Sequence, residues 1–170
     1  DRFDKSDRLP LVPFQAQYGL KIVFLMRGFE ATVSSHDVDD GGAIGHASVM
    51  AAHLTLLARD AQSLPRDSWR VLWYEMLDTP EGFVEAAIGV VQFLASACVN
   101  PAKVADIAGV VLKDKWRHPS AVHKATATTL TPQLQVVRAL DHAVSANWSI
   151  FNEPDRQIVQ RADFLPELLR

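Results

Sequence analysis

Hydrophobic and polar positions in the second half of the chain repeat with the period of an α-helix. Apolar residues recur every three or four positions in two segments. The first segment contains Val104, Ile107, Ala108, Val111 and Leu112, and the second contains Leu134, Val137, Leu140, Ala143 and Val144. This spacing places the residues of each stripe on one helix face. Proline favours the first turn of a helix, and five prolines precede or open such segments: Pro80, Pro101, Pro119, Pro132 and Pro154. The pattern predicts a series of short helices.

The first half of the chain is less regular. Residues 1–13 alternate acidic and basic side chains and contain two prolines, so we expect an extended arm. Residues 20–34 hold two short apolar runs around a glycine, which is typical of a β-hairpin. A helix over 14–27 is the alternative, and we favour it because the rest of the chain is helical. Helical spacing resumes at His46.

The Trp69, Leu72, Trp73 and Met76 side chains are predicted to share one face of a helix that begins at Asp67. Residues 79–99 carry few charges and are apolar nearly all round, as in a central helix surrounded by others. The predicted fold class is therefore all-α: a compact multi-helix bundle with an extended N-terminal arm, and with one short β-hairpin at 20–34 as the alternative. The arm is 1–13, and 14–170 form a single helical domain.

Composition supports a globular protein of this kind. The chain has 170 residues, of which 48% are hydrophobic and 22% charged, so it can bury a core without a metal or a disulfide. Its single cysteine, Cys98, lies in an apolar run and is interpreted as a small core residue. No apolar run reaches the roughly 20 residues that a membrane-spanning helix needs, and no cofactor is predicted.

Charge is unevenly distributed along the chain. Residues 103–124 contain five basic and two acidic residues, a net charge of +3, whereas the whole chain carries -3. Basic side chains around a tryptophan suit a phosphate backbone with base stacking. The candidate residues for nucleic-acid or anion binding are Lys113, Lys115, Trp116, Arg117, His118, His123 and Lys124. The alternative is that cations simply gather where one helix ends.

A second candidate is an acidic segment with histidines before the predicted helix at His46. Imidazole and carboxylate groups bind transition metals, and the weak candidate ligands are His36, Asp37, Asp39, Asp40 and His46. A calcium loop does not fit, because its twelfth position holds Ser48 rather than a glutamate. The alternative is a solvated loop. Glu75 and Glu85 are the glutamates most expected to face inward, since apolar residues flank both.

The chain contains no recognisable catalytic motif, which favours a protein that is not an enzyme. Our first hypothesis is a structural or interaction protein, a helical subunit of a homo-oligomer or of an assembly with other protein subunits. A nucleic-acid-binding module that uses the basic corner at 113–124 is the second hypothesis. The third is a metal-dependent helical enzyme built around His36–His53.

Overall fold

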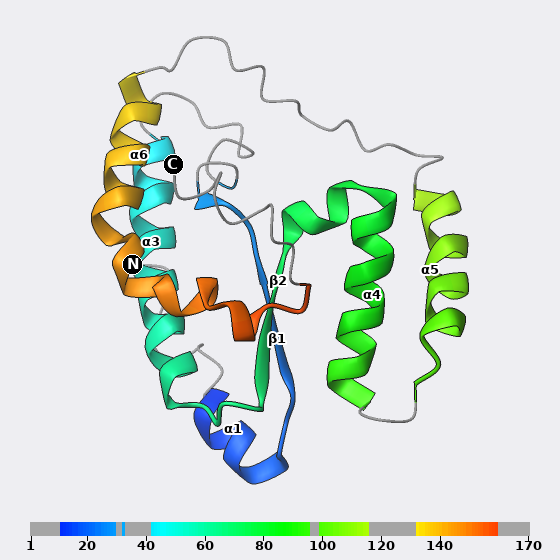
Figure 1. Ribbon diagram of the computed structural model, residues 1–170. Coiled ribbons are helices and arrows are strands. Elements are labelled where there is room, and N and C mark those ends of the chain that lie inside the picture. The colour runs from blue at the N-terminus through cyan, green and yellow to red at the C-terminus, as the bar shows by residue number, and fades with distance from the viewer. Residues whose placement is uncertain (1–10, 30–31, 33–41, 96–98, 116–131, 160–170) are drawn as a thin grey trace.

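The fold is mostly helical, as predicted, and encloses a small parallel sheet (Figure 1). The computed structural model describes residues 11–29, 32, 42–95, 99–115 and 132–159. In chain order its elements are α1 (Leu11–Tyr18), β1 (Ile22–Met26), α3 (Gly42–Ser63), β2 (Trp69–Trp73), the 3-10 helix η2 (Tyr74–Asp78), α4 (Pro80–Ala95), α5 (Pro101–Lys115), α6 (Pro132–Val144), and the 3-10 helices η4 (Ser145–Asn152) and η5 (Pro154–Arg156).

The two strands form the centre of the molecule. β1 and β2 run parallel, with Ile22 opposite Trp69 and Met26 opposite Trp73, and α3 connects them. In Figure 1, α3 and α6 lie on one side of the strands, and α4 followed by α5 lies on the other. A single parallel bridge joins Val71 to Gln157, so the chain returns to the sheet near the end of the described residues. The architecture is therefore layered around a sheet.

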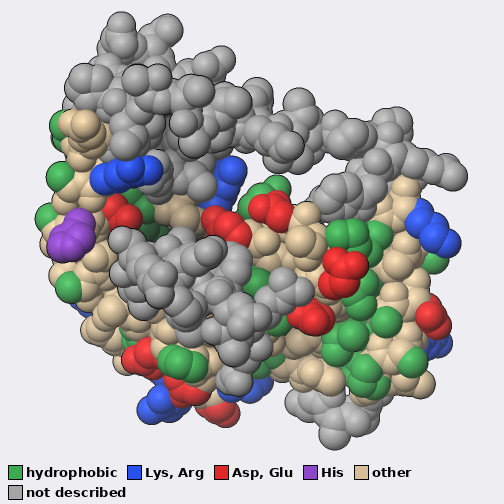
Figure 2. All heavy atoms as spheres, turned by 45° about the horizontal axis from the view of Figure 1, so that its top comes forward, with side chains coloured by type: hydrophobic (Ala, Val, Ile, Leu, Met, Phe, Trp, Pro, Cys, Tyr) green, Lys and Arg blue, Asp and Glu red, His purple; other side chains and the backbone are tan. Residues whose placement is uncertain are grey.

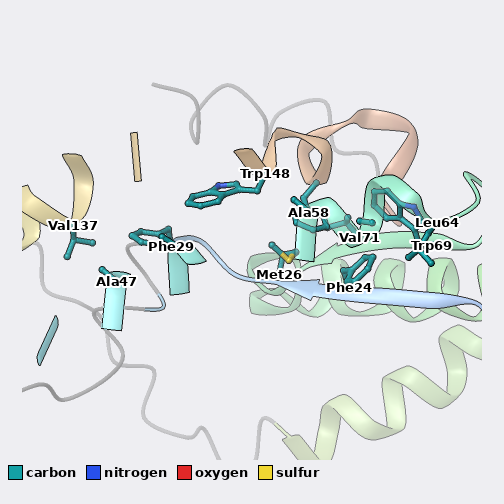
Figure 3. Packing of buried hydrophobic residues seen from close by; sticks show 13 residues of the cluster. Phe24, Met26, Phe29, Ala47, Ala58, Leu64, Trp69, Val71, Val137 and Trp148 are labelled. Carbon is teal, nitrogen blue, oxygen red and sulfur yellow. The ribbon is translucent and has the colours of Figure 1, made fainter. Parts of the chain in front are cut away.

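The main core lies between the sheet and the α3–α6 side. Figure 3 shows Phe24 and Met26 of β1 and Trp69 of β2 pointing toward it. The ring of Trp69 meets the edges of two phenylalanine rings, with centroids 5.4 Å from Phe24 and 6.1 Å from Phe151. The residues that α3 buries in this core are alanines: Ala47, Ala51, Ala58 and Ala61. These short side chains let the helix backbone approach the sheet closely.

A second, smaller core lies on the other face of the sheet. Leu72 of β2, Met76 of η2 and Ala86 of α4 form its buried centre. Alternate residues of β2 thus point to opposite clusters, as the pleat of a strand requires. β1 is apolar throughout, whereas β2 carries one charged residue, Arg70, among four apolar ones.

Three of the proline-marked helix starts are confirmed, and at Pro154 a 3-10 turn begins instead of the predicted helix. α4, α5 and α6 begin at Pro80, Pro101 and Pro132, and the 3-10 helix η5 begins at Pro154. Asn100 caps α5, since its Oδ1 accepts a hydrogen bond from the Ala102 N–H at 3.0 Å. Pro119 and Cys98 lie outside the described residues.

The hairpin alternative at 20–34 is wrong, because β1 pairs in parallel with β2 and because Phe29 and Thr32, the described residues of the expected second strand, are helical. The favoured helix over 14–27 is right only as far as Tyr18. Gly19, at a φ of 61°, ends α1 in the left-handed conformation that glycine adopts without strain. The chain then extends into β1, where each residue pairs with β2.

Three other predictions need correction. The segment at Trp69–Trp73 is a strand, although it was expected to be helical. The helix expected after Pro154 is a single 3-10 turn, and Ile158 and Val159 lie beyond it. Of the predicted arm, Leu11–Pro13 form the first turn of α1, where a missing proline N–H costs no helical hydrogen bond; residues 1–10 lie outside the described part.

Candidate functional site

The predicted basic corner lies largely outside the described residues. Lys113 is exposed in the last turns of α5, and the α5 backbone extends to Lys115. The remaining members, Trp116, Arg117, His118, His123 and Lys124, are not among the residues that the structure describes. The structure therefore brings no group of these residues together, and nucleic-acid binding stays a prediction.

The predicted metal ligands are also mostly outside the described part. His36, Asp37, Asp39 and Asp40 fall in the undescribed segment between β1 and α3. His46 is exposed in the second turn of α3. Among the described residues, no three His, Cys, Asp or Glu side chains gather closely enough to hold a metal ion. Metal binding remains a prediction from the sequence.

Polar groups do meet at the carboxyl edge of the two strands, where α/β sheets commonly bind ligands. Glu75 follows β2 and its Oε1 accepts a hydrogen bond from the backbone N–H of Gly28, 2.7 Å away, just after β1. Its Oε2 is buried and has no hydrogen-bond partner in the described structure. Beside them, the Arg27 guanidinium lies over the Tyr74 ring at 5.2 Å. The inward position predicted for Glu75 is confirmed, whereas Glu85 is exposed.

This arrangement links the ends of the two strands. One carboxylate oxygen of Glu75 ties Gly28 to the segment after β2, which fixes the paths of both connections. Arg27 is exposed, and its described contact is with the ring of Tyr74.

Charged groups also gather at the opposite end of β2. Arg156 is buried, its guanidinium lies 4.1 Å from the centre of the Trp69 ring, and it donates a hydrogen bond to the Arg66 carbonyl oxygen. Arg66 in turn forms an ion pair with Asp155 on the surface. These contacts fasten η5 to the start of β2, so their role is structural.

The pKa of Asp155 is below its ordinary value of 3.8, mainly because Arg66 donates a hydrogen bond to its carboxylate. A depressed pKa stabilises the fold above the unfolded pKa, and this contribution disappears as the pH falls through the folded pKa. We expect Asp155→Asn to lower the urea midpoint slightly at pH 7, and we expect this difference to shrink at an acid pH well below 3.8, as the carboxylate becomes protonated in the folded state. The effect is small because solvent screens the pair. An equal difference at both pH values would contradict this assignment.

The outward side of α5 carries three exposed hydrophobic residues. α5 packs against α4 through Ala108 and Leu112, which are buried. Ile107, Val110 and Val111 face away from α4 and are 58%, 68% and 49% exposed. We call these three residues the outer face of α5. Their spacing places the three side chains within about a third of the helix circumference, and together they extend along about one helical turn.

Sequence reasoning found this helix but not its outer face. It assigned Ile107 and Val111 to the same core stripe as Ala108 and Leu112, and it left out Val110. The structure corrects this, because only the half of the stripe nearest α4 is buried. The available signal was that α5 is apolar over an arc wider than one neighbouring helix covers.

Comparison with known protein families, curated proteins and solved structures returns no match for this chain. Function therefore has to be inferred from its own residues. Within the described ranges, no helix combines the length and hydrophobicity needed to cross a membrane.

Proposed function

We propose that the chain is a helical subunit of a homo- or hetero-oligomeric protein assembly, and that it contacts its neighbour through the outer face of α5. The observation that carries this proposal is the exposure of Ile107, Val110 and Val111 on one side of a helix. Isolated exposed apolar residues are normal, but adjacent ones at this spacing form the kind of face that docks against another helix.

The surroundings of the outer face support an interaction role. Figure 2 shows hydrophobic side chains gathered over the α4–α5 part of the molecule, with charged side chains around them. On α4, Leu94 is also an exposed apolar side chain, at 49%. A hydrophobic centre with a charged rim is the usual anatomy of a protein interface.

Site-specific photo-cross-linking tests the proposal directly. The variant Val110→benzoylphenylalanine carries the cross-linker in the middle of the outer face, and Gln62→benzoylphenylalanine is a matched control at an exposed position of α3. We expect irradiation of cells that express the chain to give a protein adduct of defined mass from position 110 and none from position 62. The linked peptides identify the neighbour by mass spectrometry.

Two results would overturn the proposal. No adduct from position 110 would show that the outer face touches no protein. Equal labelling from both positions would show only random encounters. Circular dichroism of each variant verifies that the cross-linking residue has not unfolded the chain.

A further inference from the structure

The neighbour that the outer face fits best is a second copy of the same chain. This inference rests on the proposed function and specifies its partner. The observation behind it is the placement of two exposed, oppositely charged residues of α5, Asp106 and Lys113. Neither forms an ion pair within the residues that the structure describes.

Helix geometry places both charges on the same flank of the outer face. At roughly 100° per residue, Asp106 is turned about 100° and Lys113 about 120° to the same side of Ile107. With a rise of about 1.5 Å per residue, they lie about 10 Å apart along the axis. The point halfway between them falls between Gly109 and Val110, which is also the middle of the outer face.

A two-fold axis through that midpoint relates two copies of α5 in antiparallel orientation. Residues on one flank then meet the same flank of the partner helix, so Asp106 of each copy lies opposite Lys113 of the other. Both ion pairs lie along one flank of the contact between the apolar outer faces. A contact of this kind is self-complementary, as closed two-fold dimers require.

Parallel pairing of the same faces would not work in this way. A parallel two-fold pair would place the charged flanks of the two helices on opposite sides of the contact, so that Asp106 and Lys113 of one copy would not meet those of the other. Only the antiparallel pair brings Asp106 of one copy opposite Lys113 of the other. The charge order along α5 therefore selects the antiparallel dimer.

We propose that the protein forms a two-fold dimer in which the outer faces of α5 pack antiparallel, flanked by two Asp106–Lys113 ion pairs. The face is one helix of 15 residues, about 22 Å long, and smaller than a standard interface. We therefore expect a dissociation constant on the order of micromolar, which rises with salt concentration because exposed ion pairs are screened.

Sedimentation equilibrium of charge-reversed variants tests the pairing. Over about 1 to 300 μM protein, the mass of the natural chain should rise from 18.8 kDa toward twice that value. Asp106→Lys and Lys113→Asp should each weaken the dimer about tenfold, because like charges then face each other. The double variant should restore the affinity to within about threefold, since the pairs re-form with reversed signs.

The control is Arg59→Asp, which makes the same charge change as Lys113→Asp on an exposed position of α3. Its dimer affinity should match that of the natural chain. Equal urea midpoints show that all variants are folded. Failure of the double variant to recover would overturn the antiparallel arrangement.

The outcomes separate this inference from the proposed function. If the natural chain sediments as a monomer throughout, while position 110 cross-links to a different protein, the dimer is wrong and the assembly role stands. If position 110 cross-links to no protein and the chain is a monomer, both are wrong. Cross-linked peptides that join two α5 segments support both.

Discussion

Replacing Trp69 with alanine should lower the free energy of unfolding by about 3–5 kcal/mol. Trp69 is completely buried, and its ring packs edge-on against Phe24 and Phe151. Arg156 covers its other side. The variant would leave a cavity where β1, β2, η4 and η5 meet. The indole Nε1 has no hydrogen-bond partner within the described structure, so the loss arises from packing.

Urea denaturation followed by circular dichroism measures this effect. The matched control is Leu25→Ala, in the neighbouring strand, where the side chain is 59% exposed. That variant should stay within about 0.5 kcal/mol of the natural chain. Similar losses from the two variants would show that Trp69 does not lie at the centre of the core.

Replacing Gly82 with alanine should lower the free energy of unfolding by about 1–3 kcal/mol, although alanine is the better helix former. A Cβ at this position would overlap the backbone carbonyl oxygen of Met76 and lie 3.0 Å from Thr79 Oγ1. A backbone atom cannot move aside as a flexible side chain can. The substitution also disturbs the cap of α4, since Thr79 Oγ1 accepts a hydrogen bond from the Gly82 N–H.

Gly45→Ala is the matched control, because it makes the same substitution in the first turn of another helix and should cause no loss of stability. Gly45 lies near the beginning of α3, and a Cβ there would meet no atom within 4 Å. This variant should be neutral or gain up to about 1 kcal/mol, because alanine loses less backbone entropy than glycine. A loss from Gly45→Ala as large as that from Gly82→Ala would contradict the close contact at Met76.

The sequence led to the hypothesis of an interaction protein, but it did not identify the surface that we propose for this function. The absence of catalytic motifs and the amphipathic helices led to that hypothesis. The tryptophan-bearing segment was predicted to be a helix, whereas it is a strand with Trp69 buried in the core. The outer face of α5 was recognised only when the structure showed how little of that helix α4 covers.

By itself the sequence determined the features that depend on local chemistry. Proline at a first helical turn and a polar cap act within a few residues, and so the starts at Pro80, Pro101 and Pro132 were predictable. Apolar neighbours on both sides predicted an inward position for Glu75 correctly but failed for Glu85, which is exposed.

Only the tertiary structure decided between strand and helix for Trp69–Trp73. Residues four apart share a face in both conformations, so the spacing of Trp69 and Trp73 fits either. What favours the strand is a distant partner: β1 supplies the hydrogen bonds, and helices cover both faces. The same holds for α5, where burial of Ala108 and exposure of Val110 depend on where α4 lies. Long-range packing, which no short sequence window contains, set both outcomes.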